Sequence, residues 1–518
     1  MSLPLLERAK EDGITFVLTP KKNRADALYT IALPETEAPA WTQALQPGEQ
    51  YRFHFDMTKC IGCKCCVVAC NEQNGNPSTI NWRRVGEIEG GWYPNTKRFY
   101  LSMGCNHCLE PSCLLGCPVD AYDKDPVTGI VRHSADTCIG CQYCTWNCSY
   151  GVPQFNPERG VVGKCDMCYG RLEQSQAPAC VNACPESAIQ IEVINIEQWK
   201  QEFSASANAP GLPSADHSVS TTRVTLPADM PPGTKKADIH RLRPEHPHWP
   251  LVVMTILTQL SVGAFATLWI RQLLGRSPRL DLAALAALLV GGLALAASTL
   301  HLGRPIHAYR ALKMWKRSWL SREVLVFGGF SNIAFIYAAL LVLKAPGSVV
   351  AGGLTTLLGI AGLTCTARIY MVRPRPAWNT NHTLFEFYLS ALLLGTLFVR
   401  GIGAVSGRWA LIVLVSSAAA QLANQSWKFF RLVRSRSFER QASAKLLSTT
   451  LAHLVLWRGA LLIAGGMLLP LSVAGSAGSI AALLVSLAGE VLGRYLFFVS
   501  VVPKNIALSY LTPGTEAA

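Results

Sequence analysis

The chain has 518 residues, half of them hydrophobic, and a formal net charge of +14. This length is enough for two or three domains, each with its own core. The positive charge indicates a membrane protein rather than a nucleic-acid-binding one, because most of the excess Lys and Arg lies in loops between apolar runs. We therefore expect no nucleic-acid partner.

The first fifty residues, 1–50, form an N-terminal extension without an export signal. The segment Met1–Gly13 has several charged residues, no apolar core and no twin-arginine pair, so nothing in it predicts export. Seventeen of the eighteen cysteines follow, between Cys60 and Cys184. Closely spaced cysteines in a domain that is not exported favour metal binding over disulfides.

These cysteines form four groups of four. Three closely spaced cysteines can surround one face of an iron–sulfur cube, while the fourth points toward a neighbouring cluster. The sequence therefore predicts four [4Fe-4S] clusters, arranged in pairs that are close enough for electron transfer. The groups are Cys60, Cys63, Cys66 and Cys70; Cys105, Cys108, Cys113 and Cys117; Cys138, Cys141, Cys144 and Cys148; and Cys165, Cys168, Cys180 and Cys184.

Zinc sites are the alternative, since they also use Cys-x-x-Cys pairs. Zinc ribbons place a long gap between two such pairs, whereas the first and third groups each put four cysteines within eleven residues. This spacing favours clusters. Cys65 falls outside the register and is read as a thiol without a ligand role, and Cys365 lies in an apolar run, where we expect it to pack as a small hydrophobic residue.

The segments CIGCKCCVVACNEQNGNP and CIGCQYCTWNCSYGVPQFN resemble the four-cluster electron-transfer subunit of the dimethyl sulfoxide reductase family of molybdoenzymes. The resemblance implies an α+β ferredoxin-like domain over 51–203, in which group one pairs with group four and group two with group three. Asn71 and Ser149 replace a proline that is usual in the family, which affects no ligand. The implied ligand sets are Cys60, Cys63, Cys66 with Cys184; Cys165, Cys168, Cys180 with Cys70; Cys105, Cys108, Cys113 with Cys148; and Cys138, Cys141, Cys144 with Cys117.

The next segment, 204–247, is rich in Pro, Ser, Ala and charge and is expected to be an extended linker. Residues 248–505 then contain apolar stretches close to the roughly 20 residues that a helix needs to cross a lipid bilayer. They predict an all-α membrane bundle of about eight helices, followed by a tail over 506–518. The stretches are 249–270, 282–302, 322–343, 348–371, 383–399, 408–430, 452–474 and 479–502.

An even number of spans places both ends of the bundle on one side of the membrane. The loops on that side carry more Lys and Arg than the opposite loops. The positive-inside rule then predicts a bacterial inner-membrane protein whose cysteine-rich domain faces the cytoplasm.

The membrane half carries a second resemblance, in STLHLGRPIHAYRALKMWKRSWLSREVLVFGGF, ARIYMVRPRPAWNTNHTLFEFYLSALLLG and GEVLGRYLFF. These segments are similar to the membrane anchor of the same reductase family. The resemblance implies a quinol site whose histidine and glutamate correspond to His301 and Glu323. Ionisable groups at membrane depth are functional candidates, and a histidine can accept a hydrogen bond from a quinol hydroxyl. Arg304 and Arg322 are expected to hold Glu323 charged; the alternative is an interfacial histidine and a glutamate paired with Arg322.

Four further polar residues lie in or beside the spans. Glu490 and Arg494, four residues apart, are expected to form an ion pair on one helix face. His382 and Arg368 are candidates to line the quinol pocket. A b-type haem needs two histidines that face each other inside the bundle, and only His453 is a plausible mid-span candidate, so no haem is expected.

The expected function is electron transfer between the membrane quinone pool and a separate molybdopterin-containing catalytic subunit that reduces an S-oxide or an N-oxide. The alternative is the reverse direction, in a cytoplasm-facing complex that oxidises sulfite or a similar oxyanion and reduces quinone. A redox sensor or assembly factor with structural clusters is a further possibility. An ion pump would need several acidic residues in mid-membrane, where Glu490 stands nearly alone.

Overall fold

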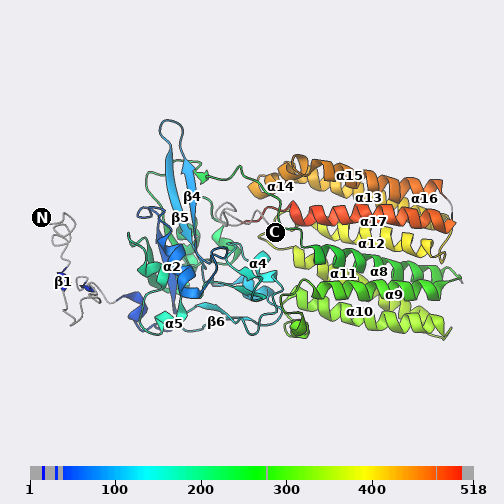
Figure 1. The fold of residues 1–518 in the computed structure, drawn as a ribbon, viewed down its shortest axis with the longest axis horizontal. Coiled ribbons are helices and arrows are strands. Elements are labelled where there is room, and N and C mark those ends of the chain that lie inside the picture. Colours follow the sequence, from blue (N-terminus) through cyan, green and yellow to red (C-terminus); the bar gives the residue numbers. More distant parts are fainter. Residues whose placement is uncertain (1–14, 18–29, 33–38, 276–277, 474, 505–518) are drawn as a thin grey trace.

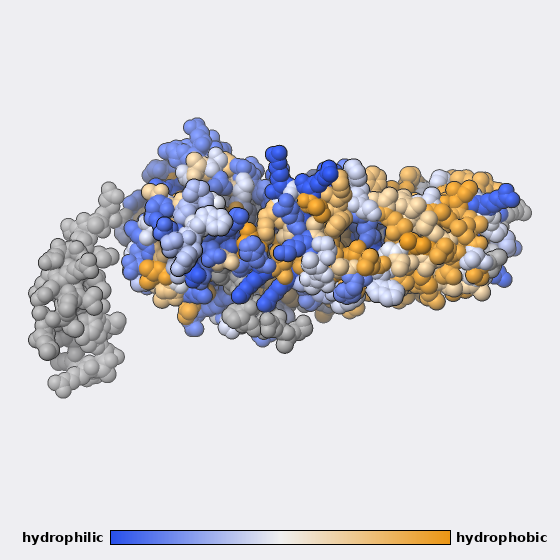
Figure 2. All heavy atoms as spheres, turned by 90° about the horizontal axis from the view of Figure 1, so that it is seen from above, coloured by the Kyte–Doolittle hydropathy of each residue, from blue (hydrophilic) through white to orange (hydrophobic). Residues whose placement is uncertain are grey.

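The computed structural model describes residues 15–17, 30–32, 39–275, 278–473 and 475–504, so most of the N-terminal extension and the whole predicted tail lie outside it. The molecule is elongated, with the cysteine-rich domain (39–247) at one end and a bundle of long helices at the other (Figure 1). Hydrophobic side chains cover the bundle, whereas hydrophilic ones dominate the surface of the cysteine-rich domain (Figure 2). The two-part architecture expected from the sequence is therefore confirmed.

The cysteine-rich domain is built on two small three-stranded sheets. In the first, β3 (Glu49–Asp56) lies between β10 (Ile189–Asn195) and β11 (Arg223–Thr225), antiparallel to the former and parallel to the latter. Its phenylalanines, Phe53 and Phe55, are buried in the core. The second sheet consists of β4 (Arg84–Gly90), β5 (Lys97–Met103) and β12 (Lys235–Lys236), and two hairpins add β6 (Tyr122–Lys124), β7 (Val131–His133), β8 (Gln154–Asn156) and β9 (Val161–Gly163).

Short helices begin within the cysteine groups. The last cysteine of each group lies in one of these helices or within two residues after it. Several begin after a residue with positive φ, as α4 does after Gln142, because the backbone turns sharply out of each cysteine loop. These helices are α2 (Cys65–Asn74), α3 (Ser112–Gly116), α4 (Tyr143–Asn147), α5 (Tyr169–Leu172) and α6 (Ala179–Asn182), and a further helix, α7 (Ile196–Ser206), follows β10.

The expectation of an extended linker over 204–247 is wrong for most of its length. The segment adds β11 and β12 to the two sheets, and Ser220 and Thr221 are fully buried. Trp199 Nε1 donates to the Ser220 carbonyl at 2.9 Å, and Thr221 donates to the Asn106 carbonyl. Serine and threonine hydroxyls supply the hydrogen bonds that let a polar segment be buried, a role that composition alone does not distinguish from solvation.

The membrane half contains a helix at each of the eight predicted positions. Seven of the described helices are long and apolar enough to cross a membrane. The helix at the sixth position, α13 (Arg408–Val433), is not among them, because its second half carries Gln421, Asn424, Gln425 and Lys428. The seven spans are α8 (Trp249–Leu273), α9 (Leu280–Thr299), α10 (Trp319–Val342), α11 (Ser348–Tyr370), α12 (Asn381–Gly401), the continuous segment Ala452–Ser472 that includes α15 (Ala452–Ile463), and α17 (Gly475–Val499).

Small residues let the central helices approach closely. A Cβ added to Gly263 on α8 would lie 1.8 Å from the carbonyl oxygen of Ala391 on α12, and one added to Gly395 would meet the backbone of Gly263 at 2.1 Å. Close backbone approach of this kind is how helices pack where lipid offers no hydrophobic driving force.

Three glycines join the two halves of the molecule. Gly140 and Gly160 of the cysteine-rich domain lie directly against Gly303, which follows α9: a Cβ on Gly303 would be 2.2 Å from the Gly160 carbonyl oxygen. Next to them, Arg304 Nη1 donates to the Ala135 carbonyl at 2.8 Å, and Arg310 Nη1 donates to the Asp136 carbonyl at 2.9 Å. Part of the positive charge on this side of the bundle therefore holds the cysteine-rich domain in place.

Candidate functional site

The structure gathers the sixteen cysteines of the four groups into four sets. Three sets each line a small cavity, and the fourth is identified by mutual proximity, since the thiols of Cys165, Cys180 and Cys168 act electrostatically on Cys70. Each set contains three cysteines of one group and the last cysteine of another. The sets are Cys60, Cys63, Cys66 and Cys184; Cys105, Cys108, Cys113 and Cys148; Cys117, Cys138, Cys141 and Cys144; and Cys70, Cys165, Cys168 and Cys180.

The donor set of each cavity fits an iron–sulfur cluster. Four thiols surround a space rather than a point, and in the described part of the sequence no three His, Cys, Asp or Glu side chains converge as the ligands of a single metal ion would. Backbone amides also point at the sulfurs, as in Ala121 N to Cys117 Sγ at 3.3 Å and Gly140 N to Cys138 Sγ at 3.4 Å. Amide contacts of this kind set the reduction potential of a bound cluster.

Two buried cations lie among the thiols, and sequence reasoning missed both. Lys164 donates to the Cys165 carbonyl at 2.6 Å and lies 3.7 Å from Cys105 Sγ. Arg83 donates to Ser102 Oγ at 3.3 Å and is 3 % exposed. Burial lowers the pKa of each cation, but the negative charge of the neighbouring thiolates outweighs it and leaves the pKa raised.

The thiols themselves need a partner for their charge. Burial raises the pKa of Cys108 and of Cys141 to about 12, so these side chains would be protonated at neutral pH unless a metal binds them. Ser218, from the segment 204–247, donates to Cys108 Sγ at 3.1 Å. The segment expected to be a linker thus contributes directly to the surroundings of one thiol set.

An aromatic junction connects the third cysteine group to the membrane half. It consists of Trp146, His248, His301, Tyr370 and Trp378. Trp146 lies on α4 between Cys144 and Cys148. Its ring stacks on His301 at a centroid distance of 6.4 Å and meets His248 at 5.4 Å, Tyr370 at 5.7 Å and Trp378 at 5.5 Å. The one signal available in the sequence was a tryptophan inside a cluster-binding motif.

His301 lies just beyond the end of α9. Its ring bonds the backbone of Cys141, and its Nε2 is buried without a hydrogen-bond partner in the described structure. Burial lowers the pKa of His301 to about 4, against the opposing effect of the Cys141 bond. The ring is therefore neutral at pH 7.

Glu323 lies near the start of α10 and is buried. Thr366 on α11 donates to its carboxylate at 2.5 Å, and the charge of Glu323 acts on Tyr370 of the aromatic junction. Among the described residues, no hydrogen bond joins His301 and Glu323.

Neither predicted arginine pairs with Glu323. Arg304 donates to the Ala135 carbonyl, and Arg322 donates to the carbonyls of Trp315 at 3.0 Å and Lys316 at 2.6 Å. The expectation that they hold Glu323 charged is wrong, and so is the alternative of a Glu323–Arg322 pair. Backbone carbonyls, of the cysteine-rich domain for Arg304 and of the loop before α10 for Arg322, give both guanidinium groups partners outside the bundle.

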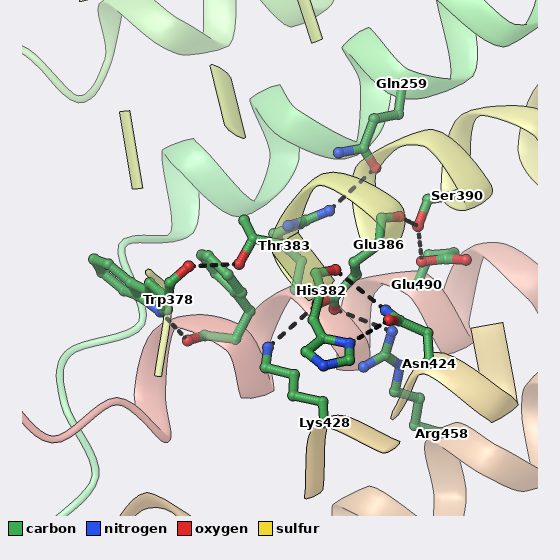
Figure 3. Close-up of polar contacts among 12 residues, drawn as sticks. Gln259, Trp378, His382, Thr383, Glu386, Ser390, Asn424, Lys428, Arg458 and Glu490 are labelled. Atoms are coloured by element: carbon green, nitrogen blue, oxygen red, sulfur yellow. Dashed lines mark hydrogen bonds and ion pairs between the residues drawn. The ribbon is translucent and has the colours of Figure 1, made fainter. Parts of the chain in front are cut away.

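The predicted ion pair on α17 does not form either. Glu490 accepts from Ser390 at 2.7 Å (Figure 3), while Arg494 donates to Gln259 at 3.2 Å and lies 3.9 Å over the Phe387 ring. The charged contacts of this region belong to α12, whose Glu386 is 3.4 Å from Lys428 and 3.2 Å from Arg458. A glutamate within α12 had not been singled out, because the spacing pattern of a single helix does not show partners on other helices.

The remaining candidates are dispersed. His382 Nδ1 lies 2.7 Å from Asn424 Oδ1 (Figure 3), whereas Arg368 lies 5.9 Å over the Trp319 ring. Cys65 is exposed and Cys365 is buried.

Comparison with known proteins agrees with this division. Residues 244–499 match the DMSO reductase anchor subunit (DmsC) family, and residues 96–194 match the 4Fe-4S dicluster domain. Over 177 residues the sequence is 37% identical to an anaerobic dimethyl sulfoxide reductase subunit of Haemophilus influenzae, covering 32% of this protein and 85% of the relative. It is 39% identical over 174 residues to YnfG of Escherichia coli K12, a probable component of an anaerobic dimethyl sulfoxide reductase, covering 32% and 83%.

A third relative is named for a different activity. Over 155 residues the sequence is 36% identical to a sulfite dehydrogenase component of Allochromatium vinosum, covering 26% of this protein and 65% of the relative.

Fold, thiol sets and membrane bundle together define an iron–sulfur oxidoreductase subunit joined to a multi-pass membrane anchor. Within that class, the protein belongs to the dimethyl sulfoxide reductase family, with the iron–sulfur subunit and the anchor fused in one polypeptide.

Proposed function

We propose that this protein transfers electrons between the membrane quinone pool and a separate molybdopterin-containing catalytic subunit. The observation that carries the proposal is the contact of His301 with the backbone of Cys141 and the ring of Trp146. A side chain just beyond the end of the membrane helix α9 thereby touches the loop of one thiol set. No substrate chemistry beyond quinol and quinone redox is assigned to this polypeptide.

The four thiol sets would hold four [4Fe-4S] clusters, each of which accepts and releases one electron. The set of Cys117, Cys138, Cys141 and Cys144 stands nearest the membrane half, because Gly140 and Cys141 contact Gly303 and His301. This set would exchange electrons with the quinone pool, and the other three would lead away from the membrane.

The side chains at the junction suit the protons of quinol oxidation, which releases two electrons and two protons. His301 Nε2 is positioned to accept a hydrogen bond from a quinol hydroxyl, since it is neutral and lacks a partner among the described residues. Glu323 would receive a proton nearby, held in place by Thr366. Positioned groups of this kind contribute roughly 100-fold to 10,000-fold to a proton-transfer step.

The terminal substrate is proposed to be an S-oxide or N-oxide, following the names of the dimethyl sulfoxide reductase relatives. The sulfite dehydrogenase relative favours a second candidate, in which electrons run from sulfite to quinone. In either case the cysteine-rich domain is proposed to face the cytoplasm from the bacterial inner membrane, since Lys and Arg are concentrated in the loops next to it.

The test is quinol-driven reduction of the clusters in membranes that contain the complex. The loss of iron–sulfur absorbance measures the rate of this reduction. We expect His301→Ala to slow reduction by about 100-fold and Arg322→Gln to leave it unchanged, while dithionite reduces the clusters equally in both variants. An unchanged rate in His301→Ala would contradict the proposal. Adding a sulfoxide to the reduced complex, or sulfite to the oxidised one, then distinguishes the two directions.

A further inference from the structure

A cavity of about 500 Å³ lies in the membrane half between α12, α13, α15 and α17. Its wall includes Glu386, Gln425, Lys428, Arg458, Trp378 and Phe497. Neither His301 nor Glu323 lines it. The volume falls within the range of roughly 300–1,000 Å³ that is typical of small-molecule sites.

The inner wall of this α13 cavity is polar and partly unsatisfied. Glu386 is held between Lys428 and Arg458 (Figure 3). Arg458 Nε and Gln425 Oε1 are buried without a hydrogen-bond partner in the described structure. Gln421, which is 2 % exposed, brings a further amide to the cavity wall. Donors and an acceptor are thus both available to a ligand, and buried polar groups ordinarily have partners.

The outer wall is apolar. Leu456, Ile463 and Phe429 line the cavity and are 74 %, 41 % and 36 % exposed, and they lie on α15 and α13, whose other exposed side chains include Trp457 and Phe430. A ligand that enters between these two helices crosses hydrocarbon first and meets polar groups only at the inner end. This order excludes a strongly charged headgroup and suits a neutral ring with carbonyl or hydroxyl groups and an apolar tail.

Aromatic rings connect the cavity to the cysteine-rich domain. Trp378 stacks on Phe497 at 5.1 Å with an interplanar angle of 8°, and both line the cavity. Trp378 also meets Trp146 at 5.5 Å. A ring in the cavity is therefore separated from the third cysteine group by Trp378 and Trp146.

We propose that the α13 cavity is a second quinone-binding site, which holds the ring of a quinone or quinol against Trp378 and Phe497 with its oxygens toward Gln425 and Arg458. The inference rests on the proposed function, because it assumes that the protein exchanges electrons with quinones. It also explains why α13 is the one helix of the eight whose composition departs from that of a lipid-covered span: its polar half faces a ligand.

Gly459 offers a way to fill the cavity without disturbing the fold. It lines the cavity, and a Cβ added to it would meet no atom within 4 Å. Gly292 on α9 is a matched control, since a Cβ there also meets nothing within 4 Å and the residue does not line the cavity. The test photolabels the intact complex in membranes with an azido-substituted menaquinone analogue and maps the labelled peptides by mass spectrometry.

In the wild type and in Gly292→Phe, we expect label on peptides from α13 and α15 as well as near His301. In Gly459→Phe the α13 and α15 label should fall at least tenfold, while the His301 label persists. Label confined to the His301 region, with normal quinol-driven cluster reduction, would overturn the second site alone. No label at either place together with no quinol-driven reduction would overturn the proposed function as well.

Phospholipid is the competing occupant and is tested on the same variants by native mass spectrometry of the purified complex. Loss of a bound phospholipid in Gly459→Phe, with no azidoquinone label on α13 or α15 in the wild type, would overturn the proposal. Equal phospholipid content in Gly459→Phe and Gly292→Phe, with the label lost only in the former, would support it.

Discussion

The two halves of this molecule bury charge in different ways. In the cysteine-rich domain, Arg83 and Lys164 are buried among thiols. In the membrane half, Glu386 is buried with Lys428 and Arg458, which are built into the same bundle. In the cysteine-rich domain, the compensating negative charge comes from thiolates, which need a bound metal to stay deprotonated at neutral pH. In the membrane half, it comes from the Glu386 carboxylate, which needs no metal.

This difference shows which half depends on its cofactor for folding. Removing a charge partner from a buried pair is far more costly than never burying the pair. The cysteine-rich domain should therefore lose its structure together with its clusters, whereas the bundle should keep its structure without them.

The largest effect is expected on removal of iron. Chelation under denaturant-free conditions should unfold the cysteine-rich domain, because Arg83 and Lys164 lose their compensating charge, at about 3–5 kcal/mol for each unpaired buried charge, and because metal binding is coupled to folding. Limited proteolysis should then cleave within 49–236, while the helices of the bundle stay protected. Equal loss of both halves would contradict the comparison.

Glu386→Gln tests the other side. This change leaves Lys428 and Arg458 without their carboxylate, and we expect it to lower the free energy of unfolding of the bundle by about 3–5 kcal/mol. Thermal unfolding in detergent measures the loss, and adding Lys428→Met should restore part of it because one unpaired charge is removed. Glu439→Gln on α14 (Phe438–Ser448), outside this cluster, serves as the control. An unchanged unfolding temperature in Glu386→Gln would show that the pairing of Glu386 with Lys428 and Arg458 does not stabilise the bundle.

Gly303→Ala tests the junction between the halves. A Cβ there would lie 2.2 Å from the Gly160 carbonyl oxygen, and we expect a loss of about 1–3 kcal/mol from overpacking. Gly328→Ala on α10 is the control, because a Cβ at that position meets nothing within 4 Å. The measurement is the unfolding temperature of the complex together with quinol-driven cluster reduction. Matching behaviour of the two variants would mean that the glycine contact does not hold the halves together.

A smaller effect is expected at the surface of the cysteine-rich domain, where Glu192 accepts from Arg52 and lies 2.8 Å from His54. Burial raises the pKa of Glu192, but the bond to His54 and the charge of Arg52 lower it further, to about 2. A depressed carboxylate pKa stabilises the fold above the unfolded value, near 4.5, and this stability is lost as the pH falls from 4.5 to about 2.

Glu192→Gln should remove this acid dependence and reduce stability at pH 7 by roughly 1 kcal/mol. Unfolding curves at pH 7 and at pH 3 measure both effects. The exposed Glu197→Gln should change neither, and a wild-type protein whose stability is flat between these pH values would contradict the assignment.

The cluster half was predictable from sequence because its determinants are local. Cys-x-x-Cys loops place three thiols side by side whatever the rest of the polypeptide does, and the family resemblance gave the partner for the fourth, which the structure places beside them. The length of the apolar stretches likewise located the helices of the membrane half. Arg83 and Lys164 were missed because nothing in their local sequence distinguishes a buried cation from an exposed one.

The membrane site was only partly predictable because its contacts join distant segments. His301 and Glu323 could be named, but the ring of Trp146 that joins the halves comes from 155 residues earlier in the sequence. The partners of Arg304, Glu386 and Glu490 are likewise on elements distant in the sequence. Composition also misjudged 204–247, whose serines and threonines bond inside the domain rather than to water.

If His301 links the quinone pool to the thiol set of Cys117, Cys138, Cys141 and Cys144, a ligand at the quinol site should change the spectrum of the cluster in that set. Redox-poised electron paramagnetic resonance on membranes, with and without a tight quinol-site inhibitor, measures this. We expect four interacting [4Fe-4S] signals, one of which shifts with the inhibitor in the wild type and fails to shift in His301→Ala. Fewer than four clusters, or an inhibitor shift that survives in His301→Ala, would contradict it.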